Sequence, residues 1–240
     1  MRRIVLAASA LLVIAAPASA ADLSLRPSVA PPPLPTWTGF YVGLNAGGAI
    51  GNAESDFSVG GTTFASVNNP LTGAAVGGQV GYNWQSGPMV YGLETDIQWS
   101  NAQGTLSAPC VAGLCGPGLT ANYSQEVSWF GTVRGRVGYA SGGWLLYATG
   151  GYAYGQLVTD ANATAPGVSA AFSARDFVNG WTAGGGIEVQ VMPRWSVKGE
   201  YLYADLGRAN HTFALPLLPA LNDSAHVTLN VVRAGVNYRF

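Results

Sequence analysis

The last ten residues of the chain, 231–240, read VVRAGVNYRF. Apolar and polar side chains alternate up to the final phenylalanine. This period of two is typical of a strand with one face in an apolar environment and the other face in a polar one. The ends of soluble domains usually fray unless another part of the structure holds them. We therefore expect these residues to form a strand that pairs with another strand of the same chain.

The first residues have the features of an export signal. Residues 1–20 combine an arginine pair, an apolar run from Ile4 to Ala16 and the small residues Ala18, Ser19 and Ala20. The run of 13 residues is shorter than the roughly 20 that a spanning helix needs, which favours a cleaved signal peptide over a membrane anchor. Residues 21–36 hold five prolines and predict an extended, periplasmic linker, so the folded domain is expected at 37–240.

The composition narrows the class of protein further. Charged residues make up only 10% of the chain, against a typical share of about 25%. Without the predicted signal peptide, nine basic and twelve acidic residues remain, and no basic patch favours nucleic acid as a partner. No apolar run after residue 20 approaches spanning length, which excludes insertion as α-helices. The apolar residues must instead lie in alternating strands.

Eight stretches with strand-like alternation follow the linker. They lie near 37–49, 74–86, 89–101, 126–140, 144–158, 177–191, 195–207 and 225–240. Three of the connections between them are tight turns, at 86–88, 141–143 and 192–194, whereas the other four run 17 to 24 residues. Short and long connections alternate, as in outer-membrane barrels. We predict an all-β fold: an eight-stranded antiparallel up-and-down transmembrane β-barrel with short periplasmic turns and four long extracellular loops.

Nine charged residues of the predicted strands share one phase of the alternation, opposite to aliphatic residues such as Val133 and Val232. They are Glu94, Asp96, Arg134, Arg136, Glu188, Lys198, Glu200, Arg233 and Arg239. Five positive and four negative charges nearly cancel, as a narrow lumen requires. The pattern predicts an interior charge network and an apolar surface that faces lipid.

All seven tryptophans lie at or near the end of a predicted strand. They are Trp37, Trp84, Trp99, Trp129, Trp144, Trp181 and Trp195. An indole ring combines an apolar body with one N–H donor, so it concentrates where lipid meets water. We predict that these residues form aromatic girdles at both rims.

A sheet in lipid cannot leave an edge unpaired, so the first strand must pair with the C-terminal one.

Three stretches carry a resemblance to a known family. They are WTGFYVGLNAGG at 37–48, EYLYADLG at 200–207 and AGVNYRF at 234–240. Over about 204 residues the chain resembles the outer-membrane immunogenic proteins of alphaproteobacteria, a porin-superfamily group of small barrels similar to the membrane domain of outer membrane protein A. The resemblance implies a surface antigen of the cell outer membrane of a Gram-negative bacterium. It also implies an assembly signal at Phe240 and Tyr238, read by the barrel-assembly machinery.

Two further groups of residues have alternative interpretations. Cys110 and Cys115 favour a loop disulfide in an exported chain, with free thiols or a metal site as alternatives. Asp223, Ser224 and His226 suggest a lipid-modifying hydrolase, but polar residues at a strand mouth explain them as well. We expect no enzymatic activity and no cofactor. The apolar stretch 213–221 is expected in a loop, with no assigned contact.

The predicted interior leaves two functions open. An eight-stranded barrel is only wide enough for its own side chains, so paired charges favour a plug and a structural, surface-presenting role. Inward glycines favour the alternative, a narrow porin for a small solute or haem. Expected partners are outer-membrane lipid and lipopolysaccharide, the assembly machinery, and cell-surface partners at the long loops.

Overall fold

The computed structural model describes residues 36–109, 120–165, 168–213 and 221–240. Within these residues the chain forms eight strands: β1 Gly39–Val59, β2 Thr62–Ser86, β3 Met89–Pro109, β4 Thr120–Ser141, β5 Trp144–Ala165, β6 Val168–Met192, β7 Trp195–Phe213 and β8 Leu221–Arg239. No helix in the described ranges is long and apolar enough to cross a membrane.

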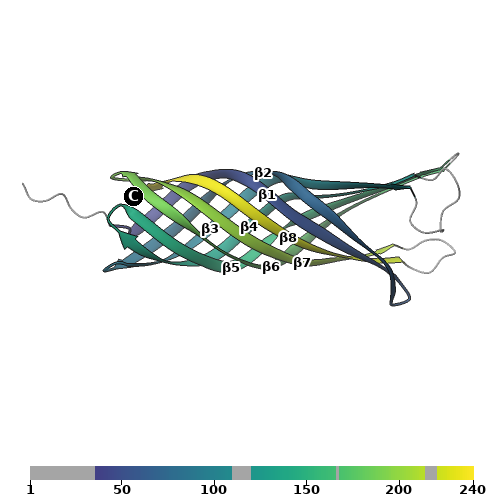
Figure 1. Cartoon of the computed structure of the whole chain (residues 1–240), viewed down its shortest axis with the longest axis horizontal. Helices are drawn as coiled ribbons and strands as arrows, with labels where there is room; N and C mark the ends of the chain where they lie inside the picture. Colours follow the sequence, from purple (N-terminus) through teal and green to yellow (C-terminus); the bar gives the residue numbers. More distant parts are fainter. Residues whose placement is uncertain (1–35, 110–119, 166–167, 214–220) are drawn as a thin grey trace, which may run out of the picture. The chain divides into compact units, whose positions relative to one another are not determined.

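The strands form a closed barrel (Figure 1). Each strand pairs antiparallel with its neighbours in sequence, and β1 pairs with β8 from Tyr41↔Arg239 to Val59↔Leu221. The N–H group of Phe240 donates to the carbonyl oxygen of Phe40 at 3.0 Å. The predicted antiparallel barrel and its closure by the C-terminal strand are confirmed.

The connections at the end of the barrel that holds the C-terminus are short. Residues 87–88, 142–143 and 193–194 join β2 to β3, β4 to β5 and β6 to β7. Gly87 and Gly142 have φ angles of 59° and 58°, a left-handed conformation that glycine adopts without strain. These turns lie where the sequence predicted them, and we call this end of the barrel the inner end.

At the opposite, outer end the strands are longer than predicted. The expected long connection at 50–73 is almost entirely strand, and only Gly60 and Gly61 separate β1 from β2. Their φ angles of 57° and 83° suit a two-residue hairpin turn. Residues 159–165 and 168–176 likewise belong to β5 and β6. The predicted long loops are thus for the most part extended hairpins.

An apolar belt covers the outward face of the inner half. In β3 the outward side chains of Tyr91, Leu93, Ile97 and Trp99 are between 42% and 62% exposed. They span nine residues, close to the roughly 9–11 of a transmembrane strand. The strands continue beyond this belt with reversed polarity: in β8, Val227 and Leu229 point inward and are fully buried. The outer half is therefore built like a soluble β-protein.

The outer half separates into two four-stranded groups, β7–β8–β1–β2 and β3–β4–β5–β6 (Figure 1). The pairing of β2 with β3 ends at Thr72↔Gln103, and that of β6 with β7 ends at Trp181↔Asp205. A register shift lies beside each of these points, at Trp99/Ala102 in β3 and at Asp205/Arg208 in β7. Because a bulge bends its strand, these irregularities account for the separation.

Several sequence predictions concern residues outside the described ranges. They are the signal peptide at 1–20, all of the linker at 21–36 except Thr36, the pair Cys110 and Cys115, and residues 214–220 of the apolar stretch.

Candidate functional site: the charged interior

The inward phase of five strands brings eight charged side chains together inside the barrel. They are Glu94 and Asp96 of β3, Arg134 and Arg136 of β4, Glu188 of β6, Lys198 and Glu200 of β7, and Arg233 of β8. Each residue is at most 5% exposed. The four cations balance the four carboxylates, as burial in a low-dielectric interior requires. We call these eight residues the charge cluster.

Arg134 lies at the centre of the charge cluster. Its guanidinium contacts Glu94, donates to Asp96 Oδ2 at 2.9 Å and donates to Glu200 Oε1 at 3.0 Å. Its Nε donates to Thr132 Oγ1 at 2.9 Å. The guanidinium of Arg134 thus contacts three carboxylates from β3 and β7. It is planar and carries several N–H donors, so it suits contacts with several carboxylates better than an ammonium group would.

Arg233 and Lys198 complete the compensation of the same carboxylates. Arg233 donates from Nη2 to Asp96 Oδ2 at 2.8 Å and from Nε to Glu200 Oε2 at 2.7 Å. The Lys198 ammonium lies 3.0 Å from Glu94 Oε1 and 3.7 Å from Glu200 Oε2. Glu94 and Glu200 therefore each contact at least two cations, which ties β3, β4, β7 and β8 together across the lumen.

Arg136 extends the charge cluster toward the inner end. It donates to Glu188 Oε2 at 2.8 Å and to the Tyr41 hydroxyl at 3.1 Å. Its guanidinium carbon lies 4.0 Å from the centroid of the Tyr147 ring, within the range of a cation–π contact. The Tyr147 hydroxyl in turn donates to Glu200 Oε1 at 3.0 Å. The aromatic rings thereby link the Arg136 contacts to those around Arg134.

The strand register explains why these charges meet. Glu94 lies directly opposite Arg134, and Glu200 lies opposite Arg233. Opposite charges at such cross-strand positions stabilise a sheet, whereas like charges destabilise it. A shift of one residue would turn every charged side chain to the lipid face, so the charge cluster also specifies the register.

Apolar layers lie on both sides of the charge cluster. Toward the outer end, eighteen buried apolar residues of the described ranges pack together in the lumen, among them Phe130, Leu157, Leu202 and Leu229. Toward the inner end, Trp37, Val90, Leu145 and Tyr147 pack together. The sequence analysis did not predict the outer apolar layer. It used the charged residues to find the inward face of each strand, and the apolar residues of this layer lie in expected loops or were given no direction.

Two sequence predictions about individual residues are corrected. Arg239 is not part of the charge cluster: it lies at the inner mouth, its guanidinium 5.4 Å from the centroid of the Trp37 ring, and it contacts the Pro193 carbonyl oxygen. Trp37 is not part of a girdle. It is only 1% exposed and packs inside the barrel, because it precedes β1 and folds under the inner mouth.

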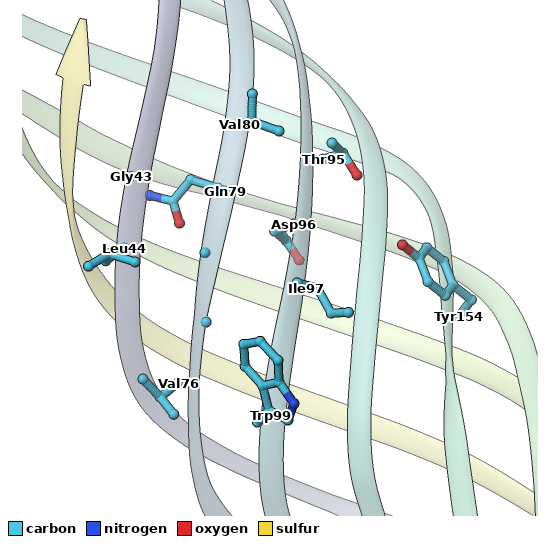
Figure 2. A pocket seen from close by; sticks show the side chains of 12 residues that line it. Gly43, Leu44, Val76, Gln79, Val80, Thr95, Asp96, Ile97, Trp99 and Tyr154 are labelled. Carbon is cyan, nitrogen blue, oxygen red and sulfur yellow. The ribbon is translucent and has the colours of Figure 1, made fainter.

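The other six tryptophans lie on the outward side of the barrel wall. Trp84, Trp144 and Trp195 are exposed near the inner turns, and Trp99 and Trp181 are exposed at the other edge of the belt. Trp129 is partly buried against Tyr154 and Phe177. Leu44, Val76, Gly78, Ile97 and Trp99 are among the residues that line a hollow of about 650 Å³ in the belt. Figure 2 shows the side chains of Leu44, Val76, Ile97 and Trp99 at this hollow.

The sequence analysis missed three uncharged polar residues that contact the charge cluster. Tyr41 donates to Glu94 Oε2 at 2.7 Å, and Asn237 donates to Glu188 Oε1 at 2.9 Å. Ser196 also bonds Glu188. Each of these residues lies in the inward phase of its strand, so polar as well as charged residues of that phase would have to be considered to predict these contacts.

Of the candidate hydrolase residues, His226 pairs with an acidic residue of another strand. His226 Nε2 lies 2.9 Å from Asp205 Oδ1 on β7. Ser224 and His226 are both described, and no hydrogen bond joins them in this part of the structure. Activation of a serine nucleophile needs that bond. The pair of His226 and Asp205 instead joins two strands above the apolar belt.

A family model described as an outer membrane protein beta-barrel domain matches residues 6–240. The chain belongs to this family. The barrel is 37% identical to the 31 kDa outer-membrane immunogenic protein of Brucella melitensis over the whole of both chains. It is 29% identical to a 22 kDa outer membrane protein of Rhizobium leguminosarum, over 87% of this chain and 80% of that one. The resemblance to outer-membrane immunogenic proteins and the location in the outer membrane are confirmed.

Solved structures support the fold of this outer-membrane barrel. The outer membrane protease OmpT of Escherichia coli aligns with a TM-score of 0.56 and 11% identity, over 84% of this chain and 97% of that one. OprG of Pseudomonas aeruginosa aligns with a TM-score of 0.51 and 9% identity, over 85% and 97%. At this identity the likeness concerns the fold alone. The two relatives above are named as outer-membrane proteins, and the one from Brucella is named as an immunogenic protein.

Proposed function

We propose that this barrel is a closed structural protein of the outer membrane that carries long β-hairpins at the cell surface. The observation that supports this most directly is the sequence of layers in its lumen, a neutral charge cluster between two apolar layers. Ions cross a membrane through polar, hydrated paths, and a layer of buried leucine and phenylalanine side chains opposes such a path. The charge cluster then fixes the register and rigidifies the wall.

The proposal excludes catalysis by this chain and assigns its partners to its surfaces. The apolar belt contacts lipid, and the polar outer half contacts lipopolysaccharide. Phe240 and Tyr238 at the inner end are read by the assembly machinery. Phe240 packs on Phe40 and Tyr238, with ring centroids 5.7 and 5.1 Å apart, so the terminal aromatic is part of the folded wall.

Planar-bilayer recording tests the closed lumen. The refolded full chain, with folding verified by its heat-modifiable mobility on gels, is expected to give no regular conductance steps. A stable unitary conductance that changes its ion selectivity in the Glu94→Gln variant would overturn the proposal. That result would support the narrow porin instead.

A further inference from the structure

A hollow of about 860 Å³ lies in the apolar belt where β7, β8, β1 and β2 meet. Its lining includes Leu44, Ala46, Val197, Ala234 and Val236. Ala46 and Ala234 are exposed and lie directly opposite each other in the pair β1–β8. Two opposed alanines leave space between the longer side chains around them. The volume lies within the roughly 300–1,000 Å³ of small-molecule sites. We call this space the closure hollow.

Two further hollows continue the closure hollow along the belt. The hollow of about 650 Å³ in Figure 2 shares Leu44 and Val76 with it. A third hollow, of about 980 Å³, shares Ala46 and Ala234 and reaches β6 and β5. Adjacent hollows with a common wall suit a ligand with two apolar chains that are joined at one end.

The inner end of the closure hollow carries aromatic and cationic groups. Trp195 and Tyr238 line it there, with ring centroids 5.1 Å apart. Arg194 is exposed, and its Nη1 donates to the Tyr238 hydroxyl at 3.1 Å. This bond holds a guanidinium at the inner rim of an apolar hollow. A guanidinium has five N–H donors and binds phosphate with two of them at once.

The charges near this rim favour an anionic group. Arg194 is the only charged residue in the sequence of the inner turns 87–88, 142–143 and 193–194. Arg239 lies beside it, because the N–H group of Arg239 donates to the Arg194 carbonyl oxygen at 2.8 Å. Even with the carboxylate of Phe240 counted, the two arginines leave this part of the rim positive.

A second copy of the barrel suits the closure hollow less well than a lipid does. A two-fold contact would bring the same surface of both copies together. Two hollows that face each other would leave their space unfilled, and unfilled apolar surfaces lose dispersion contacts. A flexible acyl chain can instead follow the shape of a hollow.

We propose that the closure hollow binds one glycerophospholipid of the leaflet next to the inner end. One acyl chain lies along Ala46 and Ala234, the other occupies the neighbouring hollow, and Arg194 binds the headgroup phosphate. Tyr238 is a positioning residue, because its hydroxyl holds Arg194. The inference rests on the proposed contact of the apolar belt with lipid and adds a specific site to it. Because this site covers both strands that close the barrel, the bound lipid stabilises the closure.

Lipid titration tests the site. The refolded full chain in maltoside micelles, which contain no phosphate, is titrated with dioleoylphosphatidylglycerol, and bound lipids are counted by native mass spectrometry. We expect saturable retention of one lipid per chain and a raised unfolding midpoint. Dioleoylglycerol has the same chains without the phosphate and should be retained about tenfold more weakly or worse.

Three results of this titration would overturn the proposal. They are retention of many lipids without saturation, equal retention of the two dioleoyl lipids, and preferential retention of lipid A. The last result would assign the site to lipopolysaccharide.

Two substitutions separate the headgroup contact from the closure hollow. Arg194→Gln should weaken retention of phosphatidylglycerol about tenfold and leave retention of dioleoylglycerol unchanged. Arg208→Gln is the matched control, since it makes the same change at an exposed arginine of the outer half. Ala234→Phe fills the closure hollow and should weaken retention of both lipids. Its control is Ala183→Phe, at an exposed position of β6 outside the closure hollow.

The outcome for these variants also distinguishes the site from the closed barrel. Unfolding midpoints in lipid-free micelles verify that each variant folds. If folded Arg194→Gln and Ala234→Phe retain phosphatidylglycerol as the wild type does, the lipid site is wrong while the closed barrel still stands. A dimer that Ala234→Phe disrupts would show that a second copy occupies the closure hollow, and it would also overturn the proposal.

Discussion

At the scale of single residues, Arg134 makes contacts on which three carboxylates depend. Truncation in Arg134→Ala leaves Glu94, Asp96 and Glu200 with too little positive charge in a buried site. We expect a loss of about 3–5 kcal/mol in the free energy of unfolding, because a buried carboxylate without its partner is costly. The measurement is urea unfolding of the refolded barrel in detergent micelles.

Val133→Ala is the matched control for that variant, because Val133 is the neighbour in the same strand and is 52% exposed on the belt. Its expected cost is about 1–2 kcal/mol at most, since only two methyl groups are lost from a surface that lipid or detergent covers. Equal unfolding midpoints for the two variants would mean that water reaches the charge cluster and that its charges are not buried.

The Tyr147 hydroxyl provides a second test at this scale. Tyr147→Phe removes the hydrogen bond to Glu200 and keeps the ring beneath Arg136. We expect a loss of about 1.5–3 kcal/mol in the free energy of unfolding, the usual range for a hydrogen bond to a charged group. Tyr82→Phe on the outward face should have little effect. A variant as stable as the wild type would show that Arg134 alone satisfies this carboxylate oxygen.

At the scale of strands, the sequence allowed the inner half to be predicted and the outer half only in part. Period-two alternation with lipid-facing apolar residues located the inner turns at 87–88, 142–143 and 193–194. Beyond the belt, alternation continues with apolar residues inside and polar ones outside, as with Val227 and Thr228. Because their outward residues are polar and glycine and asparagine occur near the tips, these strand segments have a composition similar to that of loops. The polarity reverses because the outer half is surrounded by water.

The errors at single positions have a similar physical origin. Phase predicts the direction of a side chain only within a strand. Trp37 precedes β1, which begins at Gly39, so its ring is free to fold into the lumen. Arg239 has the inward phase, but at the end of β8 its long side chain extends along the mouth. Sequence alternation carries no information about layers along the barrel axis, which depend on register.

The C-terminal strand gives a prediction about assembly. Deletion of Phe240 removes the hydrogen bond to Phe40 and two ring contacts, and it removes the aromatic end that we assign to the assembly machinery. We expect lower levels of the truncated protein in outer-membrane fractions, most clearly under strong expression. Phe240→Tyr should restore assembly, because the aromatic end remains. Normal levels of the truncated protein would show that the terminus is only the end of a strand.

At the scale of the whole molecule, the two ends of the barrel differ in construction. The inner end has tight turns and a buried tryptophan, whereas the strands of the outer end extend well beyond the apolar belt. A chain inserted with the reverse orientation would place its long polar hairpins in the periplasm. The side of the membrane that each end faces is therefore the feature on which the surface role depends.

Cysteine labelling tests this orientation. Ser66 is exposed near the β1–β2 hairpin, and Ser141 is exposed beside an inner turn. Ser66→Cys should react on intact cells with a maleimide too bulky to pass through porins, and Ser141→Cys should react only after the outer membrane is permeabilised. Both variants change one exposed side chain to another of similar size, so folding is expected to be unaffected. Labelling of Ser141→Cys on intact cells, with Ser66→Cys protected, would place the turns outside and remove the basis for a surface role of the hairpins.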